Sequence, residues 1–595
     1  MNRFFVALLA TWCLLAHPAS SQTPPNSATT SATLLAGLFN SYWEDRTRLF
    51  PLMATAQGDN RYNDRLPNDQ THAFRQQQTR FYRRYLNDLQ NIDRARLSAE
   101  DKLSYDIFQY EMRSRLEGLR LGTWMLPFAQ FYSLPTTLSQ LGTGTGAQPF
   151  KTVKDYDNWL ARVGRFPVWA DSAIGNFRQG IKAAVVLPRV LVLKIVPQLQ
   201  AQITADATKS LFYGPISRLP ATFSDADKDR LTAAYQQAIL AEVVPTYRKL
   251  ADFLQTEYLP QARSSTGLGD VPGGAEIYRY DVHLMTTTDR TPDAIYLIGL
   301  AEVKRIRAEM EVVKKQVGFK GSLPGFFGYL GSNPRFMPYK TPDEVLNAFR
   351  AIQARIAPNL PKLFGRAPKS PFEIRQTEAF RAATASAEYN RGTPDGARPG
   401  IFYVPILDAT RFNVTSGMES LFLHEAIPGH HYQSSLQQEN TDLPKFRRFA
   451  SYPAFSEGWA LYCESLGKEL GLYTDPYQRI GALGDEMHRA LRLVVDVGMH
   501  AKGMSREQAI DYMMANEPIS EQAATAEIER YLAIPGQALA YKTGQLKIRE
   551  LRSRYEKQLG KKFSLKVFHD EILAGGSMPL AVLERRLDAW AARQR

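Results

Sequence analysis

Residues 424–431 read HEAIPGHH, and residues 457–464 read EGWALYCE. These two stretches offer imidazole nitrogens and carboxylate oxygens, the ligand types of catalytic zinc sites, where three protein ligands leave a fourth position for water. A glutamate directly after the first histidine is placed to take a proton from that water. The stretches therefore predict a zinc hydrolase with one Zn²⁺ per chain, in which His424 is a ligand and Glu425 the general base.

The distribution of histidines supports a site in this part of the chain. The sequence has nine histidines, and five of them lie within residues 424–500. Each one taken singly is more typical of a packed or surface histidine than of a ligand. Their clustering with Glu425 and Glu457 favours a metal site over that simpler interpretation.

The spacing of the histidines departs from the common zinc-peptidase motif, in which two histidines four residues apart share one helical face. Position 428 is proline, and glycine follows it. Proline removes an amide donor and clashes with the carbonyl four residues earlier, so we expect the helix to break after Ile427. Such a break would turn His430 toward the metal. His431 remains the alternative ligand.

The second stretch supplies the third ligand. Glu457 and Glu464 are seven residues apart, so on a helix they share a face but are separated by about two turns. Only one of them can readily reach the metal. The other is better placed to orient a histidine ligand through its second ring nitrogen.

Further segments resemble a known family. Residues 492–500 read RLVVDVGMH, residues 535–542 read PGQALAYK, and residues 568–570 read FHD. Together with HEAIPGHH and EGWALYCE, they resemble the bacterial family called domain of unknown function 885, which is related to the gluzincin metallopeptidases. The resemblance covers most of the chain after the first thirty residues and is most specific in residues 400–580. It implies that Glu457 is the ligand and Glu464 its support.

The same resemblance implies a donor for the oxyanion that forms during hydrolysis. Gluzincins typically use a tyrosine or histidine, and the candidates here are His500, Tyr531 and Tyr541. Arg492, Asp496 and His500 are spaced four apart and share a helical face. Asp496 could bridge Arg492 and His500 and so hold the imidazole; an ordinary surface ladder of ion pairs is the alternative.

Composition and the N-terminus limit the remaining possibilities. Apolar residues make up 44% and charged residues 22%, which is typical of a globular protein. The net charge is +13, but there is no dense basic run, so we expect no nucleic-acid partner. A basic start, an apolar run over 4–15 and small residues at 19–21 predict a signal peptide over residues 1–21, hence a periplasmic or secreted protein. No later apolar run is long enough for a transmembrane anchor. Oligomeric state is left open.

We expect a mostly α fold: a large helical metallopeptidase-like body with a small β-sheet near the active-site cleft. A flexible leader (22–32) precedes an N-terminal helical region (33–270) and a catalytic region (271–595), which could form one continuous domain. Helix starts are predicted at Thr291, Thr341 and Ser505, and Ser416–Glu419 has the form of a capping box. Residues 275–288 and 400–407 are expected to be extended; the second could pair with a peptide or only pack beside the cleft.

The sequence thus predicts an exported zinc metallopeptidase-like hydrolase that acts on a peptide or small amide. Two alternatives remain. One is a metal amidase that acts on a cell-wall or other non-peptide amide. The other is an exported binding protein whose catalytic activity was lost through the rearranged HEAIPGHH spacing.

Overall fold

The computed structural model describes residues 30–378, 386–393, 396 and 398–594. The described chain is mostly helical with one small sheet, as predicted. The proposed signal peptide and residues 22–29 of the leader lie outside the described residues. The last two residues assigned to the leader, Ser31 and Ala32, belong to helix α1 (Ser31–Leu49). The hydroxyl of Thr30 caps this helix by accepting a hydrogen bond from the amide of Thr33 at 3.2 Å.

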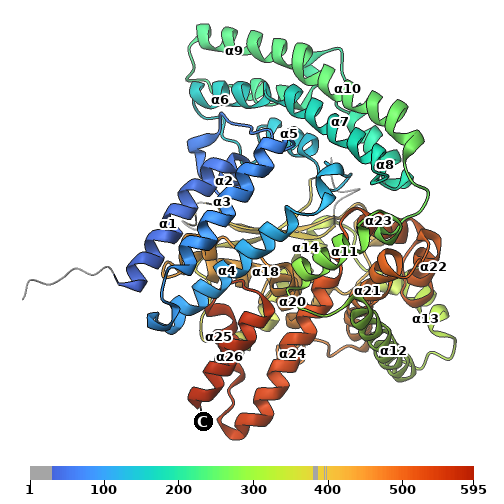
Figure 1. The fold of residues 1–595 in the computed structure, drawn as a ribbon. Coiled ribbons are helices and arrows are strands. Elements are labelled where there is room, and N and C mark those ends of the chain that lie inside the picture. The colour runs from blue at the N-terminus through green and yellow to red at the C-terminus, as the bar shows by residue number, and fades with distance from the viewer. Residues whose placement is uncertain (1–29, 379–385, 394–395, 397, 595) are drawn as a thin grey trace, which may run out of the picture.

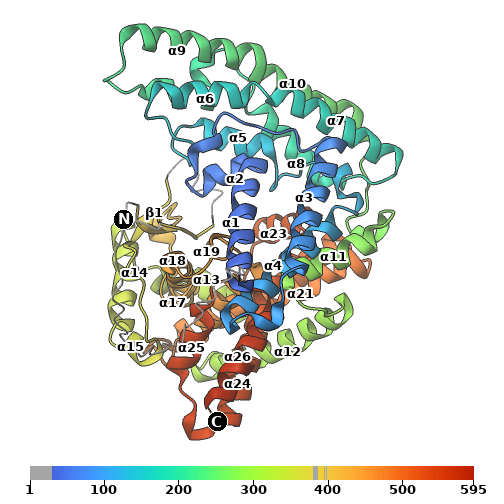
Figure 2. The ribbon, with the colours of Figure 1, turned by 60° about the vertical axis from the view of Figure 1, so that its left-hand side comes forward.

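The N-terminal part of the chain forms two groups of helices. In both views the second group, within residues 134–253, lies at one end of the molecule, above the first group (Figure 1; Figure 2). The first group consists of α1, α2 (Pro51–Ala56), α3 (His72–Gln90) and α4 (Ala99–Gly118). The second consists of α5 (Leu134–Gly142), α6 (Val153–Val163), α7 (Phe166–Lys182), α8 (Arg189–Gln200), α9 (Asp225–Ala238) and α10 (Val244–Phe253).

The prediction of an extended segment over residues 275–288 is wrong. These residues form helix α11 (Gly274–Thr286), which begins after Gly273 and ends before Thr287, both with positive φ. Ile277, Tyr278 and Val282 are buried, and their spacing places them on one helical face. Burial of this face outweighs the strand preference of Tyr, Val and Thr, because β-propensity depends strongly on context.

Three predicted helix starts are confirmed. They were predictable because a capping side chain acts within three residues of sequence. Thr291 caps α12 (Pro292–Gln316), Thr341 caps α14 (Pro342–Ile356), and Ser505 forms a capping box with Gln508 at α22 (Arg506–Asn516). The capping box expected at Ser416 is wrong. The N-cap of α17 (Met418–Glu425) is Gly417 with φ of +78°, and no side chain caps this helix.

The sheet has three strands, β1 (Phe372–Gln376), β2 (Glu388–Asn390) and β3 (Gly400–Val404), in the order β1-β3-β2. The strand expected over 400–407 is therefore present over 400–404. Strand β3 pairs with β1 in parallel and with β2 in antiparallel orientation. Because β3 is central, both of its edges are occupied, and it cannot pair with a peptide as suggested from the sequence.

The C-terminal half carries the helices that hold the site. Helices α24 (Leu539–Leu559) and α26 (Leu580–Gln594) lie at the end of the molecule opposite to α9 and α10 (Figure 1). The remaining helices are α13 (Leu323–Ser332), α15 (Leu360–Leu363), α18 (His430–Glu439), α19 (Lys445–Arg448), α20 (Pro453–Glu464), α21 (Pro476–Ala501), α23 (Glu521–Ala533) and α25 (Leu565–Ala574).

Two glycines bring α20 and α24 into direct backbone contact. A Cβ atom at Gly458 would lie 2.5 Å from the Cα atom of Gly544, and one at Gly544 would lie 1.9 Å from the carbonyl oxygen of Ala454. Real side chains never approach so closely, so both positions require glycine. This contact fixes the height of Glu457, the residue before Gly458, relative to α24.

The hydrophobic clusters join the two halves of the sequence. One cluster combines side chains of α1, α3 and α4 with those of α14, α17, α20 and α24–α26. A second combines the α5–α10 group with Val495 and Met499 of α21 and with residues of α22 and α23. Residues 33–270 and 271–595 therefore share their cores. In the described part of the chain, no helix is both long enough and apolar enough to cross a bilayer.

Candidate metal centre

The HEAIPGHH stretch breaks the helix as predicted. Helix α17 ends at Glu425 and α18 begins at His430, and the Ile427–Pro428 peptide bond is cis. Gly429 allows the chain to fold back on α17. A Cβ atom at Gly429 would lie 1.9 Å from the carbonyl oxygen of His424. Only glycine fits at this position, so Gly429 sets where His430 starts its new helix.

The EGWALYCE helix holds this turn in place. The indole nitrogen of Trp459 donates to the carbonyl oxygen of Pro428 at 2.9 Å, and Sγ of Cys463 lies 3.6 Å from the same oxygen. Both side chains are fully buried. The two sequence motifs thus lock together through backbone and side-chain contacts. Cys463 packs as a small buried side chain.

The two motifs bring His424, His430 and Glu457 together. Oε2 of Glu457 lies 3.6 Å from Nε2 of His424 and 3.4 Å from Nε2 of His430. Each of the three residues offers a ligand atom within 4.8 Å of the other two. In a tetrahedral zinc site with bonds of about 2.0–2.1 Å, neighbouring ligand atoms lie about 3.4 Å apart. The chemistry and the spacing of these donors therefore fit zinc.

Glu464 supports His424 from the opposite side of its ring. Its Oε1 lies 2.7 Å from Nδ1 of His424, which leaves Nε2 directed at Glu457. Burial acts to lower the pKa of His424, but the carboxylates of Glu457 and Glu464 outweigh it and raise that pKa to about 10. The carboxylate partner fixes both the tautomer and the orientation of the ring, the usual role of such partners at metal sites.

Glu425 follows His424 on α17 and is 9% exposed. No described residue forms a hydrogen bond with its carboxylate. Burial raises its pKa, while the charges of His424, His430 and Arg489 act in the opposite direction. A buried carboxylate with a raised pKa, and with no hydrogen-bond partner in the part of the chain that the structure describes, is suited to accept and return a proton.

His431, the alternative ligand, points away from this cluster. Its Nδ1 lies 3.0 Å from the hydroxyl of Tyr389 in β2, and its ring packs 4.7 Å from that of Phe372 in β1. Burial lowers its pKa to about 4, so the ring is neutral. The structure therefore brings together His424, His430 and Glu457, and uses His431 to attach α18 to the sheet.

Of the three candidate oxyanion donors, Tyr541 lies beside the cluster. Its ring stacks on that of His424, with centroids 6.4 Å apart and planes inclined by 16°. The guanidinium of Arg492 lies over the ring of Tyr541, with its Cζ atom 4.6 Å from the ring centroid. The hydroxyl of Tyr531 instead contacts Nε of Arg492 at 2.9 Å and the carboxylate of Glu527. The side chain of Tyr531 is 1% exposed and thus holds Arg492 rather than facing the cluster.

The expected bridge from Arg492 through Asp496 to His500 is wrong. Asp496 accepts hydrogen bonds from the hydroxyl of Tyr278 at 2.6 Å and from the amide of Gly536 at 3.2 Å. His500 accepts from the amide of Leu268 and contacts the carbonyl oxygen of Tyr531. Both ring nitrogens of His500 are therefore occupied by backbone groups, and neither contacts the ligand cluster. The surface-ladder alternative is wrong as well, because all three residues are buried against other elements.

Comparison with known families agrees with the resemblance seen in the sequence. Residues 51–587 match the family described as bacterial protein of unknown function, DUF885. The chain belongs to the DUF885 family. No curated protein matches the chain.

Two solved structures resemble this DUF885 protein along nearly its whole length. A protein from Colwellia psychrerythraea, provisionally described as a lipoprotein, is 27% identical with a TM-score of 0.85 and covers 95% of this chain and 100% of its own. A protein from Shewanella oneidensis, also provisionally described as a lipoprotein and of unknown function, is 20% identical with a TM-score of 0.73; the match covers 93% of this chain and 99% of that one. The second likeness concerns the fold alone.

Sequence reasoning missed two residues that shape the centre of this DUF885 protein. Gly429 enters the sequence prediction only as the residue after Pro428, although a glycine after a proline between two candidate ligands could have indicated a tight return of the chain. Arg489 was not singled out. It lies three residues before Arg492, on the same face of α21, and this spacing was the available signal.

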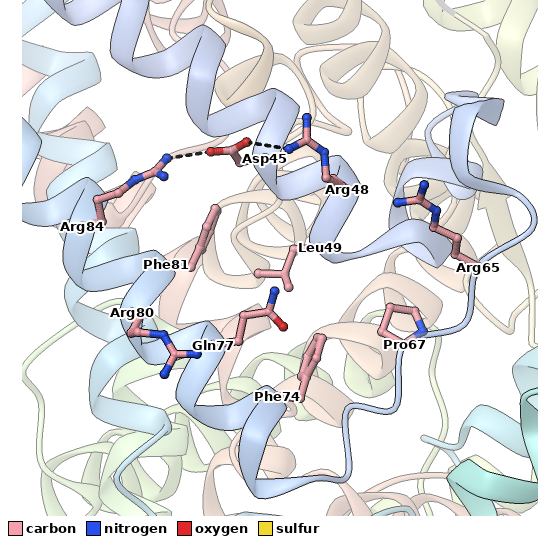
Figure 3. A pocket seen from close by; sticks show the side chains of 10 residues that line it. All are labelled: Asp45, Arg48, Leu49, Arg65, Pro67, Phe74, Gln77, Arg80, Phe81 and Arg84. Atoms are coloured by element: carbon pink, nitrogen blue, oxygen red, sulfur yellow. Dashed lines mark hydrogen bonds and ion pairs between the residues drawn. The ribbon is translucent and has the colours of Figure 1, made fainter.

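A separate concavity, of about 550 Å³, lies between α1 and α3 in the N-terminal group of helices. Figure 3 shows the side chains that line it, among them three arginines, Arg48, Arg65 and Arg84, and the rings of Phe74 and Phe81. Asp45 pairs with Arg48 at 3.5 Å and with Arg84 at 2.6 Å. Its lining has no histidine or cysteine and one carboxylate, so it offers no second set of metal ligands.

Proposed function

We propose that this DUF885 protein is an exported zinc-dependent hydrolase of the metallopeptidase type, related to the gluzincins, which cleaves a peptide or small amide. One observation carries the proposal. One carboxylate oxygen of Glu457 lies 3.4 Å and 3.6 Å from the Nε2 atoms of His430 and His424, beside the buried Glu425, whose carboxylate has no hydrogen-bond partner among the described residues. This is the donor set of a catalytic zinc site, which keeps a fourth position free for water.

His424, His430 and Glu457 would hold the ion. When bound, Zn²⁺ would lower the pKa of a water molecule toward neutrality and polarise the substrate carbonyl. Glu464 keeps Nδ1 of His424 occupied and so presents Nε2 as the ligand atom. Trp459 and Gly429 hold the turn that brings His430 to the same point.

Glu425 would act as the proton carrier. Its carboxylate takes the proton of the attacking water and returns it to the leaving nitrogen. Burial favours this exchange, because it raises the pKa of Glu425 from that of an exposed carboxyl group. Tyr541, stacked on His424, is the residue best placed to donate a hydrogen bond to the oxyanion.

Metal analysis of the purified mature protein tests the proposal. We expect about one zinc per chain in the wild type. His424→Ala, His430→Ala and Glu457→Ala should lose it, whereas His431→Gln, the matched control next to His430, should keep it. A protein that binds no zinc after incubation with the ion, or that loses zinc equally in the His431 variant, would refute the assignment.

Turnover of a peptide and amide panel tests the chemistry. Glu425→Gln should retain zinc and lose activity by about 10²–10⁴-fold, the usual contribution of a general base. Glu469→Gln, an exposed glutamate that pairs with Arg552, is the control and should keep both. Cleavage of cell-wall amides but not peptides would identify a metal amidase, and full activity of the Glu425 variant would exclude the proposed mechanism.

A further inference from the structure

A second cavity lies along α21, the helix that packs on α17. It has a volume of about 380 Å³ and lies between α13, α21 and the segment that leads into α17. One side is apolar and includes Met310, Phe327 and Leu330. The other side carries Asp485, His488, Arg489 and Glu517. A space of this size and mixed character is typical of a site for a small ligand group.

Arg489 lines this cavity, and its guanidinium is only partly paired. Its Nη1 donates to Oδ1 of Asp485 at 3.2 Å and to the carbonyl oxygen of Asp485 at 3.3 Å. Its Nε is buried, and none of the described residues accepts a hydrogen bond from Nε or from Nη2. The edge formed by Nε and Nη2 is one with which arginine binds a carboxylate through two parallel hydrogen bonds.

The other charged groups that line the cavity already have partners. The carboxylate of Asp485 accepts from the hydroxyl of Ser420 as well as from Arg489. His488 contacts Glu517 at 2.9 Å through Nδ1 and Glu527 at 3.4 Å through Nε2. A buried donor without a partner costs free energy, so the Arg489 edge is the place where an anionic group would be stabilised most.

Charged side chains that line the cavity also interact electrostatically with residues of the metal centre. The positive charge of Arg489 works against burial on the pKa of Glu425, and Asp485 lies close enough to feel the charge of His424. Arg489 likewise interacts with Tyr541, whose ring stacks on that of His424. The geometry agrees with this: Ser420, whose hydroxyl donates to Asp485, lies about one helical turn before His424 and Glu425 on α17, so the cavity wall formed by α21 packs against the helix that bears Glu425.

We propose that this cavity receives the C-terminal residue of a peptide and that Arg489 binds its α-carboxylate. The inference rests on the proposed hydrolase function and gives it a substrate class: peptides with a free C-terminus, cleaved close to that end. The apolar wall selects an apolar C-terminal side chain. Arg489 is a specificity residue in this scheme, since it holds the substrate and takes no part in proton transfer.

Matched substrates test the proposal with the zinc-loaded full-length protein. The set comprises an N-blocked Ala-Ala-Phe with a free carboxylate, its C-terminal amide, and Ala-Ala-Glu amide, which carries a carboxylate only in its side chain. We expect kcat/KM for the free acid to exceed that for either amide by about tenfold or more, the scale of a hydrogen-bonded charge pair. Equal rates for acid and amide, or a preference for the Glu amide, would overturn the assignment.

Variants locate the effect at the guanidinium edge. Arg489→Lys keeps the charge but lacks the paired edge, and Arg489→Gln loses both; the ratio of acid to amide should fall toward one in each. Arg479→Gln on the same helix pairs with Glu309 outside the cavity and should keep the wild-type ratio. Zinc content and thermal stability are measured in each variant, so that misfolding is recognised. An unchanged ratio in a folded, zinc-loaded Arg489→Lys protein contradicts the proposal.

A binding measurement separates failure of this inference from failure of the proposed function. Calorimetry with N-acetyl-phenylalanine and its amide is done on the Glu425→Gln protein and on its double variant with Arg489→Gln. Binding of the acid that is at least about tenfold tighter than that of the amide, and lost in the double variant, supports the carboxylate site even if no peptide is cleaved. Equal binding of both, or acid binding unaffected by Arg489→Gln, refutes it even if peptides are cleaved.

Discussion

Two histidine-containing groups stood out in the sequence, and the fold treats them in opposite ways. The HEAIPGHH and EGWALYCE stretches converge, so that His424, His430 and Glu457 meet at one point. Arg492, Asp496 and His500 share one face of an unbroken helix, and yet their side chains diverge. Asp496 binds α11 and the turn before α24, whereas His500 binds the segment before α11 and the end of α23.

The difference teaches that a shared helical face does not by itself make a site. Residues spaced four apart rise about 6 Å along the axis at each step, so that each meets a different neighbouring element. Convergence needs a break in the helix and a second element across it. Pro428 and Gly429 provide the break, and α20 lies across it. The four predictions below test this contrast, beginning with the largest expected effect.

Gly429→Ala should abolish the convergent site. Its Cβ would lie 1.9 Å from the carbonyl oxygen of His424, so the turn must shift and carry His430 away from Glu457. We expect a loss of about 3 kcal/mol or more in unfolding free energy, at or above the usual cost of overpacking, and loss of bound zinc. Denaturant titration and metal analysis measure these effects. Gly328→Ala on α13 is the control, because nothing lies within 4 Å of its Cβ.

Asp496→Leu should show the reverse pattern. It leaves the hydroxyl of Tyr278 and the amide of Gly536 without their buried acceptor, at a cost of about 1–3 kcal/mol for each group. Zinc content should remain at the wild-type value, because Asp496 supports the packing of α21 and not the ligands. A variant that is stable but free of zinc would place Asp496 in the metal centre and break the contrast.

The extent of prediction from sequence follows the same contrast. Caps at Thr291, Thr341 and Ser505 were predictable because they act within a few residues. The ligand set was predictable because residue type and a Pro-Gly break carry the information locally. The influence of Arg489 on the pKa of Glu425 was not predictable, since 64 residues separate the two and only the packing of α17 on α21 brings their helices together. The prediction of a strand where α11 lies failed for a related reason: burial of one face of this helix outweighs the local preference of its residues for a strand.

Asp496 also gives the divergent group a pH dependence. Burial raises its pKa to about 7, despite the hydrogen bonds from Tyr278 and Gly536, and burial raises that of its neighbour Asp281 to about 8. The folded protein therefore binds more protons than the unfolded chain between about pH 4 and pH 8, and this contribution to stability is lost as the pH rises through that window. The difference in unfolding free energy between wild type and Asp496→Asn should shift in favour of the asparagine variant from pH 5 to pH 8. A difference that does not change with pH would show that Asp496 is ionised throughout.

Trp459→Phe should have the smallest effect and the most specific one. It removes the hydrogen bond from the indole to the carbonyl of Pro428 and keeps most of the ring packing. We expect a loss of about 1 kcal/mol in stability, the net value of one hydrogen bond, together with a measurably weaker affinity for zinc. The affinity change is the informative result, since Trp459 touches the turn and not a ligand. If zinc binds equally well to this variant, the turn is held by Gly429 and the α20–α24 contact alone, and convergence depends on backbone fit rather than on the side chains that cover it.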